Sequence, residues 1–452
     1  TSITISGNRP DGTAVSRSMT LQYQGPYHQL SQIDGPRMDV SDITRFEYYP
    51  DDAGQGNNRA RLRRVTGPDN VALRDNIQYS TTGRIVSESR SNGLDLAYAY
   101  YPGNDRLETL QLTDLQTGQV RIIRWTYLDT GEVDTITTGY NTTDATTLTL
   151  GYDEARRLTR ITDGVGHYIE YVLDSEGNVE QENYYDAGDV LVKSLNQTFD
   201  LYNRLDQFTQ LNENLDVNFD PDGTLDRATD GKGAVTDYNY DGLRRLTEVI
   251  ADANGSDPAT GNARVQYGYD AQDRVIRVTD PNDHDTLYRY DDLGNLLSLD
   301  SSDTGLTAMN YDEAGNLLTR QDANGQLFTY HYDAYNRLTA IDVADDAHDI
   351  SYSYDSCNQG HGRLCSITYG SQPPVSYAYN AFGDITQHQG YSYQYDHAGR
   401  RQAITYPSGD VLHYHYDAAG QIDDVQLTLN GTATPSPSPA LSTTTPSATS
   451  TS

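Results

Sequence analysis

The chain has 452 residues, of which 37 are Tyr and 38 are Gly, against only 6 Phe, 3 Met and 1 Trp. Its net charge is −33, and it contains only two lysines, Lys193 and Lys232. Nucleic acids and anionic membrane surfaces both bind clustered Lys and Arg, so this charge argues against either partner. No run of about 18 apolar residues occurs, which excludes insertion into a membrane as a helix.

The abundance of Tyr and Gly indicates a β-rich chain. Tyr suits half-buried strands, in which the ring packs and the hydroxyl stays hydrated or hydrogen-bonded. Gly together with Asp and Asn is typical of tight turns. No stretch has an apolar period of 3.6 residues, so we expect very little helix. From Thr1 onward the chain is polar and strand-like without a secretory signal, which we interpret as a cleaved signal or a fragment.

Residues 1–150 contain the weakest form of a repeat that becomes clear later in the chain. Tyr79-Ser80 precedes a turn and a short strand-like segment, and Leu128-Asp129 precedes another. We therefore predict that residues 1–150 form degenerate β-repeats that join the same sheet as the residues after them.

Residues 151–430 carry the repeat in its clear form. Tyr-Asp pairs begin at residues 290, 311, 332 and 354, with spacings of 21, 21 and 22 residues. Within the unit 311–332, two turns that start with Asp and end with Gly alternate with two short strands. This length suits a β-hairpin. The pattern predicts an all-β chain in which tandem hairpins of about 21 residues form a spiralling sheet, tube or shell.

The return strand of each unit ends in Tyr-x-Tyr. Alternation in a strand places Phe328, Tyr330 and Tyr332 on one face. If successive hairpins pair edge to edge, the second tyrosines form a ladder, with neighbouring rings stacked at about the strand spacing of 4.8 Å or offset from it. The predicted ladder consists of Tyr240, Tyr269, Tyr290, Tyr311, Tyr332, Tyr354, Tyr379, Tyr395 and Tyr416.

These units resemble the YD or Rhs repeats of bacterial surface proteins, toxin shells and animal teneurins. The shared core is Tyr-Asp-x-x-Gly-Asn/Arg-Leu, present at Tyr290–Leu296 and Tyr311–Leu317 and in variant form at Tyr332–Leu338. The segment Gly362-Arg363-Leu364-Cys365 also resembles a recurrent Rhs segment. The clear match covers roughly residues 150–425, and a dozen units at near-constant spacing are a far more specific signal than one.

The resemblance implies a long β-sheet that winds into a tube or hollow shell. In the toxin members this shell encloses a toxic C-terminal domain, released after a DPxG-containing segment by aspartyl self-cleavage. Neither the segment nor the cleavage site follows the repeats here, where the chain passes directly into a low-complexity tail.

The tail, residues 431–452, is rich in Pro, Ser and Thr and has almost no charge. It suits a disordered linker or stalk, and it equally suits an O-glycosylated stretch of an extracellular protein. Asn-x-Ser/Thr sequons add possible N-glycosylation, although such sequons often arise by chance. The candidate glycosylation sites are Asn141, Asn196, Asn254, Asn430, Ser436, Ser438, Thr443, Thr444 and Thr445.

The two cysteines, Cys357 and Cys365, flank His361. One interpretation is a metal site formed by both thiolates and the imidazole, but structural zinc needs a fourth ligand and none is evident. The signs of an extracellular protein favour a disulfide across one hairpin or loop instead.

No established catalytic motif is present: the sequence lacks HExxH, GxSxG and a P-loop. Carboxylates are frequent because the turns use Asp, so no glycosidase pair can be singled out. The Asp-rich loops 280–285 and 342–349 could hold Ca²⁺ but lack the spacing of known calcium motifs. We therefore predict neither an enzyme, nor a metal, nor a cofactor.

The features together favour a secreted structural protein, a subunit of a surface fibre or extracellular filament that is glycosylated and assembles head to tail. The open edges of a spiralling sheet invite pairing with a second copy. Two alternatives remain: a fragment of an Rhs toxin-encapsulating shell, and an adhesin that binds carbohydrate or a partner cell through exposed tyrosines.

Overall fold

The computed structural model describes residues 1–210, 213–255, 261–344 and 348–431. This part of the chain is all-β, with 37 strands in one continuous antiparallel succession and one short 3₁₀ helix, η1 (Ala53–Asn58). Every strand pairs with the next strand in the chain, from β1 with β2 to β36 with β37. The predicted fold class and the very low helix content are confirmed.

The strands are short and evenly spaced along the chain. The first thirteen are β1 (Ser2–Asn8), β2 (Ala14–Gln24), β3 (Gln29–Asp34), β4 (Thr44–Tyr48), β5 (Leu62–Thr66), β6 (Ala72–Tyr79), β7 (Ile85–Arg90), β8 (Leu94–Tyr100), β9 (Leu107–Asp114), β10 (Val120–Tyr127), β11 (Val133–Thr138), β12 (Thr146–Tyr152) and β13 (Leu158–Thr162). The next twelve are β14 (Tyr168–Leu173), β15 (Val179–Tyr185), β16 (Leu191–Phe199), β17 (Leu205–Gln210), β18 (Glu213–Phe219), β19 (Leu225–Thr229), β20 (Val235–Tyr240), β21 (Leu246–Ala251), β22 (Ala263–Tyr269), β23 (Val275–Thr279), β24 (Asp285–Tyr290) and β25 (Leu296–Ser301). The last twelve are β26 (Gly305–Tyr311), β27 (Leu317–Gln321), β28 (Leu327–Tyr332), β29 (Leu338–Val343), β30 (Ile350–Tyr354), β31 (Leu364–Tyr369), β32 (Val375–Tyr379), β33 (Ile385–His388), β34 (Tyr391–Tyr395), β35 (Arg401–Thr405), β36 (Val411–Tyr416) and β37 (Ile422–Thr428).

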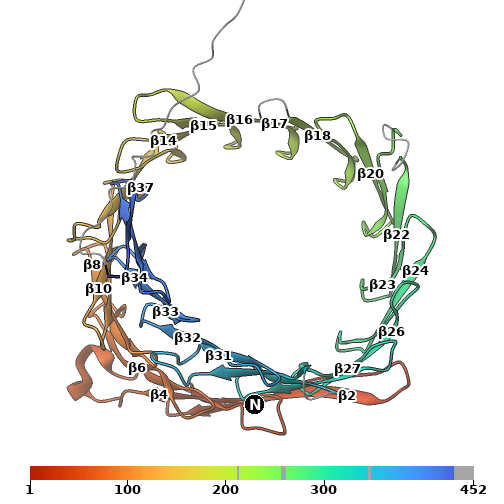
Figure 1. The fold of residues 1–452 in the computed structure, drawn as a ribbon, viewed down its shortest axis with the longest axis horizontal. Helices are drawn as coiled ribbons and strands as arrows, with labels where there is room; N and C mark the ends of the chain where they lie inside the picture. The colour runs from red at the N-terminus through yellow and green to blue at the C-terminus, as the bar shows by residue number, and fades with distance from the viewer. Residues whose placement is uncertain (211–212, 256–260, 345–347, 432–452) are drawn as a thin grey trace, which may run out of the picture.

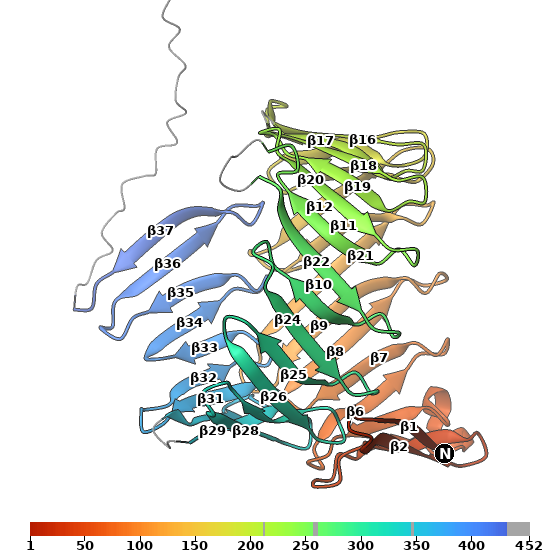
Figure 2. The same cartoon turned by 90° about the vertical axis from the view of Figure 1, so that its right-hand side faces the viewer.

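The sheet winds into a spiral of more than one turn (Figure 1). Seen from the side, the C-terminal strands β31–β37 lie beside the N-terminal strands and are displaced from them along the spiral axis (Figure 2). The turn between β1 and β2 contacts the turn between β24 and β25, and the turn between β11 and β12 contacts the turn between β34 and β35. One full turn of the spiral therefore takes 23 strands at both places.

Two kinds of turn alternate along the chain and form the two rims of the spiral. We call those that follow Tyr-Asp, from an even-numbered to an odd-numbered strand, YD turns, and the others return turns. In the YD turn at Asp241, the carboxylate accepts hydrogen bonds from the backbone N–H groups of Leu243 (2.8 Å) and Arg245 (3.1 Å). The Asp side chain thus closes the turn that its own backbone begins.

The fourth residue of the YD turn is left-handed. Gly315 has φ +87°, and the equivalent Asn336 and Arg244 have φ +59° and +63°. Glycine occupies this conformation without strain and Asn tolerates it, which explains the Gly or Asn found here in most repeats.

A β-bulge follows each repeat tyrosine. Between β26 and β27, Asn310 pairs with Thr319 but Tyr311 pairs with Leu317, so Leu318 is unpaired. The same shift recurs next to Tyr240, Tyr269 and Tyr290. Bulges increase local twist and bend the strand. Their repetition at one rim is a source of the regular curvature of the sheet.

The repeat tyrosine bonds backward to the preceding hairpin. The hydroxyl of Tyr311 donates to the carbonyl oxygen of Leu296 (2.9 Å), and that of Tyr379 donates to the carbonyl oxygen of Leu364 (2.7 Å). The same bond joins the hydroxyls of Tyr48, Tyr79, Tyr100, Tyr127, Tyr152, Tyr269, Tyr332, Tyr395 and Tyr416 to a carbonyl of the preceding hairpin.

An arginine of the preceding YD turn covers many of these rings. Arg245 pairs with Asp241 of its own turn, lies 4.9 Å from the centroid of the Tyr269 ring, and donates to the carbonyl oxygen of Asp270 (3.1 Å). Arg274, Arg337, Arg363 and Arg400 lie over the next repeat tyrosine in the same way. Guanidinium groups are attracted to aromatic faces, so each arginine ties two consecutive turns together.

The predicted stacking of neighbouring tyrosine rings is not the arrangement that forms. The repeat tyrosines lie on every second strand, which separates them by about 9.5 Å, twice the strand spacing. The ladder is therefore built from alternating tyrosines and arginines, not from ring on ring. The close stack that the structure does contain, Tyr168 with Tyr185 at 4.6 Å, joins adjacent strands.

The wall of the spiral is one sheet thick. Among the described residues, the buried hydrophobic side chains are Ile77, Leu94, Leu96, Cys365, Ala381 and Ala403. Most other apolar side chains, including the repeat tyrosines, are half-buried within the Tyr-bearing face of the sheet. Cohesion therefore comes from neighbouring hairpins rather than from a central core.

We predict that removal of one tyrosine hydroxyl weakens its hairpin locally. Tyr269→Phe loses the 2.6 Å bond to the Leu246 carbonyl and should lower the stability of β21–β22 by about 1 kcal/mol. Tyr269→Ala, which also removes the ring, should cost about 3–5 kcal/mol. Hydrogen exchange of the β21–β22 amides measures both.

Tyr202→Phe is the matched control, because Tyr202 is 78% exposed. It should change exchange in its own hairpin by less than about 0.5 kcal/mol. Equal effects of the two Tyr→Phe variants would contradict a structural role for the hydroxyl bond.

Candidate functional site

The most distinctive feature of the molecule is the seam where its second turn meets its first. Here the YD turns from β24–β25 to β36–β37 lie against the return turns from β1–β2 to β13–β14. The contacts join residues that are about 245 to 300 positions apart, such as Gln359 with Asp114 and Arg37 with Asn336. The seam converts an open spiral ribbon into a continuous wall.

The seam begins at the N-terminal hairpin. The Asn8 backbone N–H donates to the carboxylate of Asp292 (2.8 Å), and the Asp292 N–H donates to the Asn8 carbonyl (2.9 Å). The next contact comes from the loop between β3 and β4. Its buried Arg37 side chain donates to the carbonyl of Asp333 and to the side chain of Asn336, both at 3.2 Å, in the YD turn between β28 and β29.

The centre of the seam holds a buried carboxylate. Asp114 is 0% exposed. Its oxygens accept bonds from the backbone N–H of Gln116 (2.9 Å) and Thr117 (3.1 Å) in its own turn. They also accept from the Gln359 side chain (2.8 Å) and the Ala381 N–H (3.2 Å) of the second turn. Burial raises the pKa of Asp114, but these donors outweigh it and hold the pKa below its usual value.

A small apolar cluster seals the same place. Ala381, from the YD turn after β32, packs with Leu94 and Leu96 of β8, and Phe382 joins the cluster. Arg121 of the first turn lies 4.1 Å from the Phe382 ring centroid and forms an ion pair with Asp384. The seam is therefore held by apolar contact as well as by polar bonds.

A polar cluster lies beside it. Asp69 of the β5–β6 turn accepts hydrogen bonds from the Tyr335 hydroxyl (2.6 Å) and from His361 Nε2 (2.9 Å), both in the second turn. Burial and the bond to Asp69 raise the pKa of Tyr335. Burial raises the pKa of Asp69, yet the bonds from Tyr335, the Val71 N–H and His361 bring it below the usual value.

Asp355 completes this cluster. Its carboxylate receives both ends of the Arg337 guanidinium, at 3.0 and 2.5 Å, and the Gly362 N–H at 2.6 Å. The ligand atoms of Asp69, Asp355 and His361 lie within 4.8 Å of one another, as those of a metal site would. However, Arg337 already neutralises Asp355, His361 Nε2 already bonds to Asp69, and a cation at this place would lie beside the guanidinium. The geometry therefore favours an ion-pair network over a metal site.

A second histidine crosses the seam near its end. His397 Nδ1 donates to Asp144 at 2.7 Å, and the His397 backbone N–H donates to the same oxygen at 3.0 Å. Arg400 donates to the Asp144 carbonyl at 3.1 Å. Burial raises the pKa of Asp144, but the bonds from His397 outweigh burial and bring the pKa below its ordinary value.

Two glycines permit close approach of the turns. A Cβ at Gly67 would lie 2.0 Å from the Tyr335 hydroxyl oxygen, and one at Gly164 would lie 2.2 Å from the Ala418 carbonyl oxygen. These distances are far below van der Waals contact. Glycine is therefore required at both positions because the turns approach each other so closely at the seam.

The residues singled out from the sequence lie partly at the seam. Cys357 and Cys365 form a disulfide in the loop that carries His361, which leaves no thiolates for the metal alternative. The ladder tyrosines lie along the wall, with Tyr332, Tyr354, Tyr379, Tyr395 and Tyr416 on strands of the second turn. Asp69, Asp114 and Arg37 were not singled out, because no sequence signal reports a contact across 250 residues.

The candidate glycosylation sites are scattered. Asn141, Asn254 and Asn430 are exposed in turns or at strand ends, whereas Asn196 is half-buried within β16. Asn254 and Asn430 donate hydrogen bonds to the carbonyls of Gly233 and Ser408, both at 2.7 Å. Ser436, Ser438, Thr443, Thr444 and Thr445 lie outside the described residues. Glycosylation stays a prediction.

The Asp-rich loops also stay without an assigned ion. Asp280 accepts bonds from the backbone N–H groups of Asn282 and His284 and so closes its own turn. The loop 342–349 lies partly outside the described residues. In the described part of the chain, no helix is long and apolar enough to cross a membrane.

The chain is similar in sequence to one protein family and in fold to several solved structures. The family model described as Teneurin YD-shell matches residues 239–359 and 308–434. The fold is similar to that in the crystal structure of TcdB2-TccC3-Cdc42, with a TM-score of 0.65 and 13% identity over 94% of this chain and 26% of that chain. It is also similar to TcdB2-TccC3 without its hypervariable C-terminal region, with a TM-score of 0.53 and 12% identity over 94% of this chain and 26% of that one.

This chain thus spans about a quarter of the length of those solved chains, and the identities are low enough that the likeness concerns the fold. No curated protein sequence matches the chain.

We predict that Gly164→Ala separates the two turns locally. The added methyl group would meet backbone rather than a mobile side chain, so β36–β37 must move away. Amide exchange in β36 and β37 should rise by at least about tenfold. Gly242→Ala is the control, because a Cβ there meets nothing within 4 Å. Equal exchange in the two variants would show that the turns are not in contact at Gly164.

We also predict that acid loosens the seam. The pKa values of Asp69, Asp114 and Asp144 are lowered in the folded chain, so their contribution to stability is complete above about pH 4, the pKa of an unfolded Asp. It is lost as the pH falls through their lower folded values. The fluorescence of Trp125 in β10, the only tryptophan, follows urea unfolding of the first turn. The urea midpoint should fall between pH 5 and about pH 3, and Asp114→Asn should reduce this dependence.

Proposed function

We propose that the chain, whose residues 239–434 match the YD-shell family model, forms a section of the wall of a hollow shell that encloses a polypeptide. The observation that carries this proposal is the seam. A fibre or an adhesin needs only the repeated hairpins, whereas sealing successive turns to each other serves to separate an inside from an outside. The matching family model is itself described as a shell.

The dimensions support an interior space. A turn of 23 strands at a spacing of about 4.8 Å has a circumference of roughly 110 Å, and strand tilt widens it further. Closed sheets of about 16–18 strands already enclose water rather than packed side chains. A wall one sheet thick, about 10 Å, would leave an interior roughly 25 Å across or more, wide enough for an extended or partly folded polypeptide.

The other expected functions have less support. The fibre subunit requires β1 of one copy to pair with β37 of another, and the exposed Ile3 and Ile5 of β1 are the feature that favours such pairing. A charge of −33 on each copy opposes it through mutual repulsion. The adhesin requires freely exposed tyrosines, whereas the repeat tyrosines are bonded to the neighbouring hairpin.

The proposal gives the described residues a structural role without catalytic chemistry. It also places the chain outside the cytosol for part of its life, which the Cys357–Cys365 disulfide supports because such bonds persist in oxidising compartments. The partner is the enclosed polypeptide, and neither nucleic acid nor membrane insertion forms part of the proposal.

We predict that a polypeptide attached after Ser452 is protected by the shell. The chain would be produced with an unstructured reporter segment at its C-terminus and exposed to a non-specific protease. Protection should extend the lifetime of the reporter at least about tenfold over that of the free segment, because cleavage needs access to an open chain.

Gly164→Ala, which breaches the seam, is the matched variant and should shorten that lifetime. Gly242→Ala should leave it unchanged. A reporter that is degraded as fast on the intact shell as in free solution would overturn the encapsulation proposal.

A further inference from the structure

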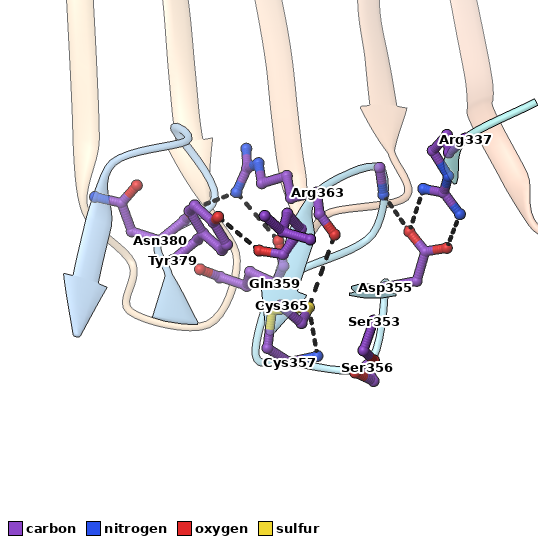
Figure 3. The surroundings of a disulfide bond; sticks show 12 residues. Arg337, Ser353, Asp355, Ser356, Cys357, Gln359, Arg363, Cys365, Tyr379 and Asn380 are labelled. Carbon is purple, nitrogen blue, oxygen red and sulfur yellow. Dashed lines mark hydrogen bonds and ion pairs between the residues drawn. A yellow bond between two sulfur atoms is a disulfide. The ribbon is translucent and has the colours of Figure 1, made fainter. Parts of the chain in front are cut away.

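One YD turn is closed by a disulfide. The loop between β30 and β31, which we call the latch loop (residues 355–365), continues for nine residues, 355–363, before β31 begins, whereas the YD turn after β26 takes five. The Cys357–Cys365 disulfide closes it, with 5.3 Å between the two Cα atoms (Figure 3).

The latch loop reaches two places on the first turn. His361 Nε2 lies 2.9 Å from the carboxylate of Asp69, in the return turn between β5 and β6. The Gln359 side chain donates at 2.8 Å to Asp114, in the return turn between β9 and β10. A single loop therefore bridges two return turns that are four strands apart, and one of its anchors is the buried carboxylate at the centre of the seam.

The loop takes its shape from the disulfide. Gly360 packs on the bond so closely that a Cβ would lie 2.3 Å from Cys357 Sγ and 2.6 Å from Cys365 Sγ. The Arg363 N–H donates to the Gly360 carbonyl at 2.7 Å, and the Arg363 guanidinium donates to the Gln359 carbonyl at 3.1 Å. Figure 3 shows Gln359 next to the disulfide and the Arg363 guanidinium directed away from it toward Asn380, with Asp355 between Arg337 and the loop backbone.

The residue that reaches Asp114 is held in an unfavourable conformation. Gln359 has φ +49°, a left-handed value that costs a non-glycine residue about 1 kcal/mol or more. Such a conformation persists only while its surroundings impose it. The surroundings here are Gly360, Arg363 and the disulfide, so loss of the disulfide would free Gln359 to leave Asp114.

We propose that the latch loop is a redox latch, and that reduction of Cys357–Cys365 opens the seam between the two turns. Cys365 is 4% exposed and Cys357 is partly exposed, so a dithiol reductant attacks Cys357 Sγ. Cys365 leaves as a thiolate and takes a proton. The second thiol of the reductant then displaces Cys357 as a thiol, which leaves the reductant as a disulfide and the chain with two thiols.

The seam opens because Asp114 loses a hydrogen-bond donor. Of its four donors, Gln359 and Ala381 belong to the second turn, and Gln359 is the one in the latch loop. A buried carboxylate that lacks a donor must take up water or move toward it. Water entry there separates Ala381 and Phe382 from β8. The release of an enclosed polypeptide on reaching a reducing compartment rests on the proposed shell function, whereas the opening of the seam does not.

Hydrogen exchange of the purified chain, with and without a dithiol, tests the latch. The chain has only two cysteines, so any effect of the reductant comes from this bond. Exchange of the Gln116, Thr117 and Val71 amides should rise by roughly ten- to hundredfold on reduction, the range expected for loss of a short disulfide loop. The Asp186 turn, where the carboxylate closes only its own backbone, should not respond.

Two variants separate the latch from a general loss of stability. Cys357→Ser/Cys365→Ser should exchange rapidly at both anchors and show no response to dithiol. Gln359→Ala, with the disulfide intact, should raise exchange at Gln116 and Thr117 in the absence of dithiol but leave Val71 protected. Complete reduction, shown by two free thiols, with unchanged exchange at all three amides would overturn the latch.

The attached reporter distinguishes failure of the latch from failure of the shell function. Loss of reporter protection only after reduction supports both proposals. A reporter that is unprotected in either state overturns encapsulation, and the amide exchange then still decides the latch. A reporter that stays protected after reduction, although the anchor amides exchange rapidly, overturns release through the seam.

Discussion

The structure depends on one linkage, repeated from hairpin to hairpin. In many units an aspartate closes the YD turn and orients an arginine that lies over the next tyrosine, whose hydroxyl bonds back to the previous hairpin. A two-stranded hairpin is marginal by itself in water. Charge, cation–π attraction and a hydrogen bond at each junction supply the cohesion that a second layer would otherwise provide.

A wall built in this way has a weakness that the spiral resolves. A ribbon of hairpins leaves both of its rims unsealed, and hairpin-to-hairpin bonds do nothing to join one turn to the next. At the seam the same aspartate-centred chemistry acts between turns, with Asp69, Asp114 and Asp144 of the first turn bound by donors of the second. Burial of Asp114 and the apolar contact of Ala381 with β8 make the seam tightest where the latch loop lies.

Under the proposed function these features have a common purpose. A shell must be continuous while it holds its contents and must have a place where it can open. The repeats would supply continuity, and their fold is shared with solved structures that have little sequence in common with this chain. The latch loop departs from the repeat because the only two cysteines of the chain close it, and loops that depart from a repeat are where function is expected.

The sequence by itself determined the hairpins. Tyr-Asp spacing, turn glycines and alternation are local signals, and local geometry suffices to predict antiparallel strands, the faces of Tyr330 and Tyr332, and the closing role of turn aspartates. The pattern of tyrosines alone predicts neighbouring rings, because it does not show the turn arginine that lies over many of the rings. Only the tertiary structure decided the number of strands in a turn and the partners of Asp69 and Asp114. These depend on the curvature accumulated over 23 strands, which brings together residues with no shared pattern in the chain.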